Sequence, residues 1–236
     1  MAGDLATVIE TRCENRPVVI VGHSLGATIA RLLAAIRADL VAGLVLVDPI
    51  PERLVLRYGR WTEPIGHLMY GTLEALAQLG LIDAVTALPP FSAITRSSTS
   101  PLATFTDVER GALGAEMRRP LTHRTARREF SGLLRSRPEL QALTFGDTVD
   151  VPFTVISGGH THRCASPLRR AATAEHERLA DGSPDGRHIV VAHGGHLIHR
   201  YQPDIVVAAI GDLLDRISLI QQQRPQPTTP TLIYNL

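Results

Sequence analysis

Four short apolar runs along the chain predict strands, and each is rich in β-branched residues. The runs are Val18–Val21, Gly43–Val47, Pro152–Ser157 and His188–Ala192. Strands that are apolar on both faces are typical of a parallel sheet that helices cover on both sides.

Helical patterns separate the apolar runs. Residues 4–14 place apolar side chains on one face, and a second helical pattern places Ile29, Leu32, Leu33 and Ile36 at helical spacing. Ser166 and Pro167 open a predicted helix to about Ala180, and Pro203 opens the last one. This alternation predicts an α/β fold with parallel strands, whose ligands bind at the carboxyl ends of the strands.

Residues 51–150 show no strong strand pattern and contain several amphipathic pieces. Helices are predicted over residues 62–79 and 122–136, and Thr106 to Glu109 forms a capping box at a helix start. We therefore expect a helical insertion at 51–150, between the two parts, 1–50 and 151–220, of one core. Residues 221–236 are expected to form a flexible tail.

Composition narrows the class of protein. The 236 residues are 44% hydrophobic and 20% charged, which is typical of a soluble globular chain and not of a disordered one. The net charge is +1 and no apolar run reaches membrane-spanning length, so neither a nucleic-acid partner nor a membrane span is expected. The oligomeric state stays open.

Two cysteines, Cys13 and Cys164, are too few for a disulfide framework and fit a reducing compartment. The N-terminus lacks the basic and apolar regions of a signal peptide. A cytoplasmic location is therefore expected.

The strongest chemical pattern is Gly22-His23-Ser24-Leu25-Gly26, between a predicted strand and a predicted helix. A tight strand-to-helix turn exposes the serine hydroxyl and points the amide of Leu25 at the same place, as an oxyanion donor. Gly22 and Gly26 are expected because a Cβ at either would collide with the turn. A serine in such a turn is a candidate nucleophile.

Serine needs a base, and His196 is the best candidate. It follows the last predicted strand through Gly194 and Gly195 and precedes the last helix. His193 and His199 are the competing choices.

A carboxylate must orient that imidazole. Asp48 directly follows the second predicted strand, whereas the loop after the third strand, residues 158–165, contains no carboxylate. Asp181 and Asp185 lie beyond the next helix, so elimination favours Asp48.

The segments VVIVGHSLGATIARLLAA (residues 18–35), LVLVDP (44–49) and GHLIHRYQP (195–203) resemble the α/β-hydrolase superfamily. The resemblance implies a Ser–His–acid triad, an acyl-enzyme intermediate, a helical cap and no cofactor. Carried over, Ser24 is the nucleophile, His196 the base and the Leu25 amide an oxyanion donor.

The chain departs from this family in two ways. Most relatives carry the acid after the strand that ends here at Ser157, where Thr161 and His162 stand instead; a minority carry it at the position of Asp48. Relatives also have about four strands and two helices before the nucleophile elbow, which is the turn at residues 22–26 here, and a loop among them supplies a second oxyanion donor. We therefore expect an N-terminally shortened hydrolase with its first strand at a sheet edge.

The sequence thus predicts a serine hydrolase that cleaves an ester or related acyl bond in a small-molecule substrate. Candidate pocket residues in the cap are Leu68, Met69, Tyr70, Leu73 and Phe91.

Two alternatives stay open. One is a non-catalytic remnant or ligand-binding protein. The other is a zinc-dependent hydrolase, since His160, His162, Cys164 and His196 are zinc-ligand types, although no metal is expected. Seven arginines within residues 118–137 fit a solvated cap surface or a surface for an anionic ligand.

Overall fold

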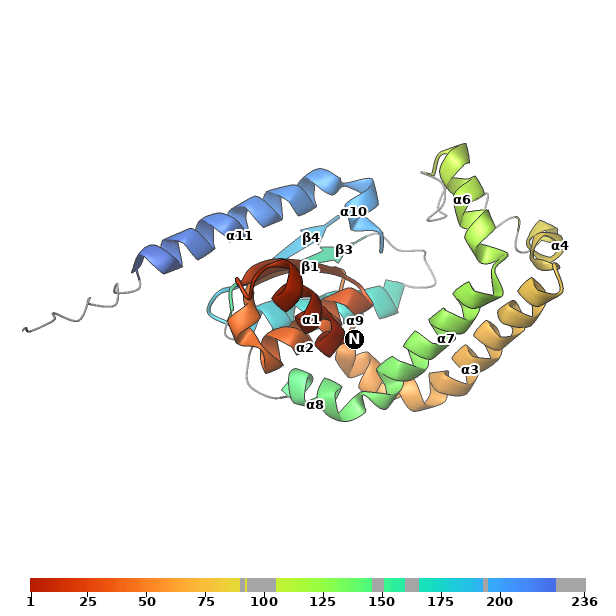
Figure 1. Ribbon diagram of the computed structural model, residues 1–236, viewed down its shortest axis with the longest axis horizontal. Coiled ribbons are helices and arrows are strands. Elements are labelled where there is room, and N and C mark those ends of the chain that lie inside the picture. The colour runs from red at the N-terminus through yellow and green to blue at the C-terminus, as the bar shows by residue number, and fades with distance from the viewer. Residues whose placement is uncertain (90–91, 93–104, 146–150, 160–165, 193–194, 224–236) are drawn as a thin grey trace, which may run out of the picture.

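The computed structural model describes residues 1–89, 92, 105–145, 151–159, 166–192 and 195–223 (Figure 1). Its centre is a parallel sheet of four strands in the order β1-β2-β3-β4. The strands are β1 (Val18–His23), β2 (Val41–Val47), β3 (Phe153–Gly158) and β4 (Gly186–Val191). The predicted α/β fold with parallel strands is confirmed, and β1 lies at one edge of this sheet.

Helices cover both faces of the sheet because alternate strand residues point to opposite sides. Leu44 and Leu46 of β2 pack in one apolar cluster with α1 (Ala2–Arg12) and α2 (Leu25–Ile36). Val45 and Val47 pack in a second cluster with the last helix. The remaining elements of the core are η1 (Ala38–Leu40), α9 (Ser166–Asp181), α10 (Ile198–Tyr201) and α11 (Pro203–Gln223).

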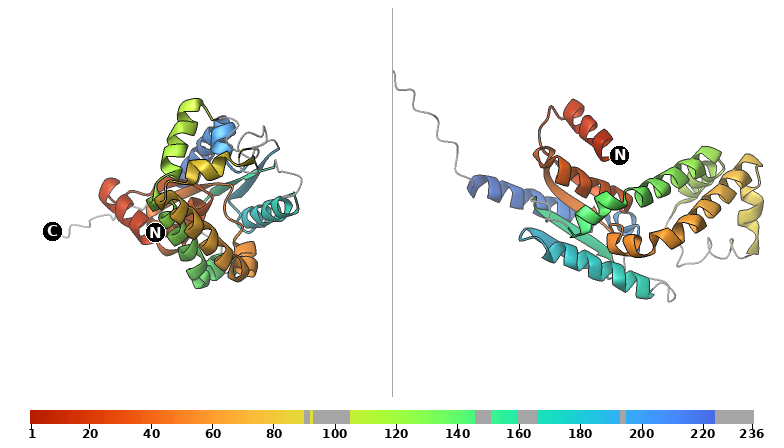
Figure 2. Two further views of the ribbon diagram at one scale, coloured as in Figure 1. Left: turned by 90° about the vertical axis from the view of Figure 1, so that its right-hand side faces the viewer. Right: turned by 90° about the horizontal axis from the view of Figure 1, so that it is seen from below.

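A helical arm leaves the core between β2 and β3 and extends away from the sheet (Figures 1 and 2). We use this name for the described residues 52–89 and 105–145. The arm contains α3 (Glu52–Gln78), α4 (Ile82–Ala87), α6 (Asp107–Met117), α7 (Pro120–Arg135) and α8 (Arg137–Phe145).

Two glycines let α3 and α7 pack closely, side by side. A Cβ at Gly59 would lie 2.7 Å from Cδ2 of Leu134, and one at Gly66 would lie 2.2 Å from Cε1 of Phe130. These glycines face the partner helix, so they stabilise the pair although glycine weakens an isolated helix.

Most predicted element bounds agree with the structure to within a few residues. The prediction for 62–79 was wrong at its start, because α3 begins at Glu52 and runs through Pro64. The capping box is confirmed: Thr106 Oγ1 accepts from the Glu109 amide at 3.3 Å, and Glu109 Oε2 accepts from the Thr106 amide at 2.8 Å. Helix α11 continues to Gln223, three residues into the predicted tail.

None of the helices within the described ranges is long and apolar enough to span a bilayer.

Candidate active site

Ser24 occupies a tight turn between β1 and α2, with φ 54° and ψ −118°. A left-handed φ is costly for a residue with a Cβ and is characteristic of strained functional turns. The turn needs Gly22, because a Cβ there would lie 2.6 Å from the carbonyl oxygen of Gly26. The expectation for Gly26 was wrong: a Cβ there has nothing within 4 Å, because its position in the first turn of α2 faces open space.

Asp48 follows β2 directly and also has a left-handed φ, 42°. Backbone hydrogen bonds hold the neighbouring strand ends together. The Ser24 amide donates to Val47 O at 3.0 Å, and the Asp48 amide donates to Ile156 O at 2.7 Å. The ends of β1, β2 and β3 therefore meet, and Asp48 is almost fully buried between them, with 2% of the residue exposed.

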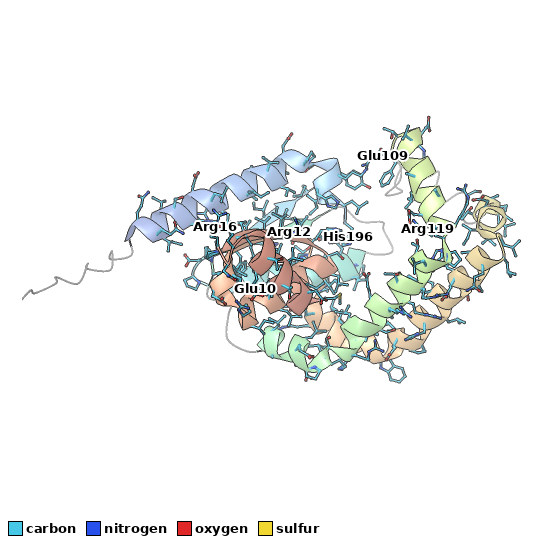
Figure 3. The ribbon with its side chains drawn as sticks, in the orientation of Figure 1. Glu10, Arg12, Arg16, Glu109, Arg119 and His196 are labelled. Atoms are coloured by element: carbon cyan, nitrogen blue, oxygen red, sulfur yellow. The ribbon has the colours of Figure 1, made fainter. Side chains whose placement is uncertain are left out.

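His196 contacts this buried carboxylate. Its Nδ1 donates to Asp48 Oδ2 at 2.6 Å, which leaves Nε2 as the free, basic nitrogen of the neutral ring. The imidazole is half exposed and lies on the side of the core that faces the helical arm (Figure 3). The structure thus joins two residues that are 148 positions apart in the chain.

The second carboxylate oxygen of Asp48 has two further partners. The Gly158 amide donates to Oδ1 at 3.1 Å, and Arg169 Nη1 of α9 donates at 2.5 Å. Burial alone would raise the pKa of Asp48, but the hydrogen bonds from His196, Arg169 and Gly158 outweigh it and hold the pKa below the usual value. Asp48 is therefore a carboxylate at neutral pH.

His23, the residue before Ser24, supports the position of His196 from the other side. Its Nε2 donates to the His196 carbonyl oxygen at 2.8 Å, and the two rings pack with centroids 4.5 Å apart. The ring of His199 packs edge-on against His23 at 4.6 Å. Burial lowers the pKa of His23, so this ring is neutral near pH 7.

A buried chain of hydrogen bonds runs behind Asp48. His188 Nε2 donates to Ser157 Oγ at 2.7 Å, and Ser157 Oγ donates to His176 Nδ1 at 2.7 Å. His176 Nε2 in turn donates to Pro49 O at 2.9 Å, next to Asp48. Burial lowers the pKa of His176 to about 4, so the ring stays neutral and ties α9 to the Asp48 turn.

The remaining candidates divide between the described and the undescribed parts of the chain. The Leu25 amide is the first of α2, where helix amides lack partners within the helix. No hydrogen bond joins Ser24 Oγ to His196 among the described residues; such bonds are often long in ligand-free enzymes.

His193 and the proposed zinc ligands His160, His162 and Cys164 lie outside the described residues. The described residues hold no cluster of metal-ligand side chains.

The candidate pocket residues of the cap are not gathered around Ser24 by any described contact. Leu68 is 73% exposed, and the ring of Tyr70 packs at a tilt against Phe130 of α7, with ring centroids 6.1 Å apart. Phe91 lies outside the described residues. A cavity of about 180 Å³ lies beside the Asp48 turn, lined by Pro49, Ile50 and His176 among others.

Sequence reasoning missed Arg169, Gly158 and His23 as partners of the Asp48–His196 pair. Arg169 left one weak signal: it stands in the first turn of a helix that follows a strand of the sheet. His23 was noted as part of the elbow motif, but nothing in its spacing links it to His196.

Several of the arginines within residues 118–137 have partners in the arm itself. Arg124 and Arg127 pair with Glu74 of α3 at 2.8 and 2.9 Å, and Arg118 pairs with Asp83 at 2.8 Å. These contacts fit a solvated cap surface better than a surface for an anionic ligand.

The chain is similar to several known proteins in sequence or in fold. One segment of 45 residues is 51% identical to Lipase LipV of Mycobacterium tuberculosis; it covers 19% of this chain and 17% of the lipase. The fold is similar to a probable hydrolytic enzyme of Pseudomonas aeruginosa PAO1, with a TM-score of 0.56, 16% identity, and coverage of 90% of this chain and 68% of that one. It is also similar to the epoxide hydrolase CorEH, with a TM-score of 0.58, 16% identity, and coverage of 92% and 74%.

At these identities, the similarity to the two solved structures shows the fold alone. The model of the alpha/beta hydrolase family matches residues 2–209, which include both strand-end turns and the His196 loop. On this match, the chain belongs to the alpha/beta hydrolase family.

Proposed function

We propose that the protein is a serine hydrolase that cleaves an ester or a related acyl bond. The contact that carries the proposal is Asp48 Oδ2 to His196 Nδ1 at 2.6 Å, next to the strained turn of Ser24. An ionised acid on Nδ1 fixes the tautomer in which Nε2 accepts a proton. The 45-residue segment that is 51% identical to a lipase supports an ester substrate.

In the proposed reaction, Ser24 Oγ attacks the substrate carbonyl and His196 Nε2 takes the hydroxyl proton. The Leu25 amide, at the positive end of α2, donates to the oxyanion that forms. His196 then gives the proton to the leaving group, which departs. Water repeats the attack on the acyl-enzyme with His196 as base, and this releases the acid and restores Ser24.

The test is the intact mass of the protein after incubation with a fluorophosphonate. We expect a single adduct that Ser24→Ala abolishes and Ser218→Ala, on distant α11, retains. A p-nitrophenyl ester should then be turned over with the same dependence on Ser24. No adduct on folded protein would overturn the proposal and favour a non-catalytic ligand-binding protein. An adduct without ester turnover would keep the reactive serine but contradict the substrate class.

A further inference from the structure

We propose that Arg169 is a positioning residue that balances the charge of Asp48 and so sets the pH range in which His196 acts as base. The inference rests on the proposed function, since it assigns a role within the same site. It starts from an ion pair that the proposed triad mechanism does not itself require.

Asp48 is a buried carboxylate that accepts hydrogen bonds from three donors. Oδ2 accepts from His196, whereas Oδ1 accepts from the Gly158 amide and from Arg169. The Arg169 side chain is 19% exposed and that of Asp48 is 2% exposed. Solvent therefore screens the attraction between these charges much less than it screens a surface pair.

This pairing changes the charge that His196 faces. A lone carboxylate offers the imidazolium of the reaction a full negative charge. Here the guanidinium, which stays protonated at any working pH, makes the Asp48–Arg169 pair neutral overall. The protonated ring therefore gains less electrostatic stabilisation from this neutral pair than it would gain from Asp48 alone.

Among the described residues, the other titratable groups that face the pair are histidines from three elements. His23 comes from β1, His199 from α10 and His176 from α9. His23 and His176 are held neutral by burial. Among these groups, only Arg169 carries a permanent charge. Removing Arg169 should therefore change the net charge beside His196 more than removing any of the three histidines.

The experiment measures the rate of fluorophosphonate labelling against pH in wild type and Arg169→Gln. We expect the midpoint of the acidic limb to rise by roughly one pH unit in the variant, because a nearby cation is lost and Asp48 is no longer neutralised. Below the midpoint, the labelling rate of each protein is expressed as a fraction of its own plateau rate. This fraction should be about tenfold lower in Arg169→Gln than in wild type. Arg169→Lys keeps the charge and should restore the midpoint.

Arg187→Gln is the control, since Arg187 of β4 forms an exposed pair with Asp212 of α11. It should leave the midpoint unchanged. A variant Arg169→Gln that labels more slowly at every pH, with the wild-type midpoint, would overturn the inference, because a merely structural arginine gives that result. Arg169→Met keeps the side-chain length and replaces Arg169→Gln if the latter does not fold.

A second measurement separates this inference from the proposed function. The ring of His196, assigned in NMR spectra by comparison with His196→Gln, can be titrated whether or not Ser24 reacts. Its midpoint should rise in Arg169→Gln and return in Arg169→Lys; equal midpoints in wild type and Arg169→Gln would contradict the role of Arg169. Absence of labelling in wild type would overturn the proposed function alone.

Discussion

At the scale of single residues, the site concentrates strain where two strands end. Ser24 and Asp48 both adopt left-handed φ values, 54° and 42°. Such a conformation costs on the order of 1–3 kcal/mol for a non-glycine residue and persists only where surrounding contacts fix it. Here the amides of both residues are held by carbonyl groups of the neighbouring strands. The strained backbone thus places a hydroxyl and a carboxylate at one edge of the sheet.

Replacing Asp48 with Asn tests the role of its charge. Asn retains the shape, but it loses the negative charge and can favour the wrong tautomer of His196. We expect the rate of fluorophosphonate labelling at pH 7 to fall by about 10⁴-fold, as for a triad acid. A fall of less than threefold would show that another group serves as the acid.

The buried ring of His176 predicts a pH-dependent stability. Its pKa is lowered from 6.5 to about 4 in the fold, so the unfolded chain binds a proton more readily. Stability from this group is therefore fully present above about pH 6.5 and is lost as the pH falls toward 4, by roughly 3 kcal/mol in total.

Urea unfolding at pH 7 and pH 4.5 measures this loss. His176→Gln should be less stable at pH 7, because the hydrogen bonds to Ser157 and Pro49 are weakened. Its stability should fall less between the two pH values than that of wild type. Equal falls in both proteins would mean that other groups cause the acid sensitivity.

At the scale of elements, the elbow between β1 and α2 offers a matched pair of glycines. Gly22→Ala places a Cβ 2.6 Å from a backbone oxygen, so the turn must shift and labelling of Ser24 should be lost. Gly26→Ala meets nothing within 4 Å inside α2 and should stabilise the protein by about 0.5–1 kcal/mol. Thermal unfolding and labelling of both variants provide the test; equal behaviour of the two would contradict this account of the elbow.

The start of α6 is linked to the core beside the candidate site. Arg200 of α10 donates to both carboxylate oxygens of Glu109, at 2.8 and 2.6 Å, and lies 3.9 Å from the ring centroid of Phe105. Glu109 is also the capping-box residue of α6. The pair with Arg200 and the bonds from Thr106 lower the pKa of Glu109 to about 2, so its charge is present at neutral pH.

Glu109→Gln removes this charge and keeps a hydrogen-bond acceptor for the capping box at the start of α6. We expect faster hydrogen exchange in the amides of α6, because the end of the arm loses its ion pair with α10. Glu116→Gln, in an exposed pair with Arg119 within the arm, should leave that exchange unchanged. Unchanged exchange in Glu109→Gln would show that the ion pair does not hold α6.

At the scale of the whole molecule, local patterns predicted the sheet and the position of each strand-end turn. The four apolar runs mark β1 to β4 because a fully buried strand must be apolar over its whole length. The sharp turn at Ser24 could be predicted from the sequence because it requires a glycine at position 22, where any Cβ would clash with the backbone. The start of α3 was missed because Pro51, Gly59 and Pro64 obscure its helical pattern.

Contacts between distant residues were beyond such reasoning. Arg169 meets Asp48 across 121 positions, and Ser157 meets His176 and His188 through single polar side chains. Periodicity reports which face of an element is buried, whereas one polar pair inside the fold leaves no periodic trace. Asp48 was reached by elimination for that reason, and its arginine partner was not reached at all.

One buried ion pair joins the core to the helical arm and predicts how the molecule unfolds. Arg31 of α2 bonds to Glu52 at the start of α3, and its other nitrogen donates to Leu143 O of α8 at 3.1 Å. Both charged side chains are less than 10% exposed. Glu52→Gln should therefore cost about 3–5 kcal/mol, because it leaves the Arg31 charge buried without its counter-charge.

The double variant Arg31→Met with Glu52→Gln should recover much of that loss, since no unpaired charge then remains inside. Urea unfolding of wild type, Arg31→Met, Glu52→Gln and the double variant measures the coupling free energy. As a control, Asp212→Asn in the exposed pair with Arg187 should cost less than about 1 kcal/mol. Strictly additive losses in the double variant would mean that Arg31 and Glu52 act separately. Coupled losses in a single transition would mean that core and arm unfold together, with the Arg31–Glu52 pair as one of the contacts that join them.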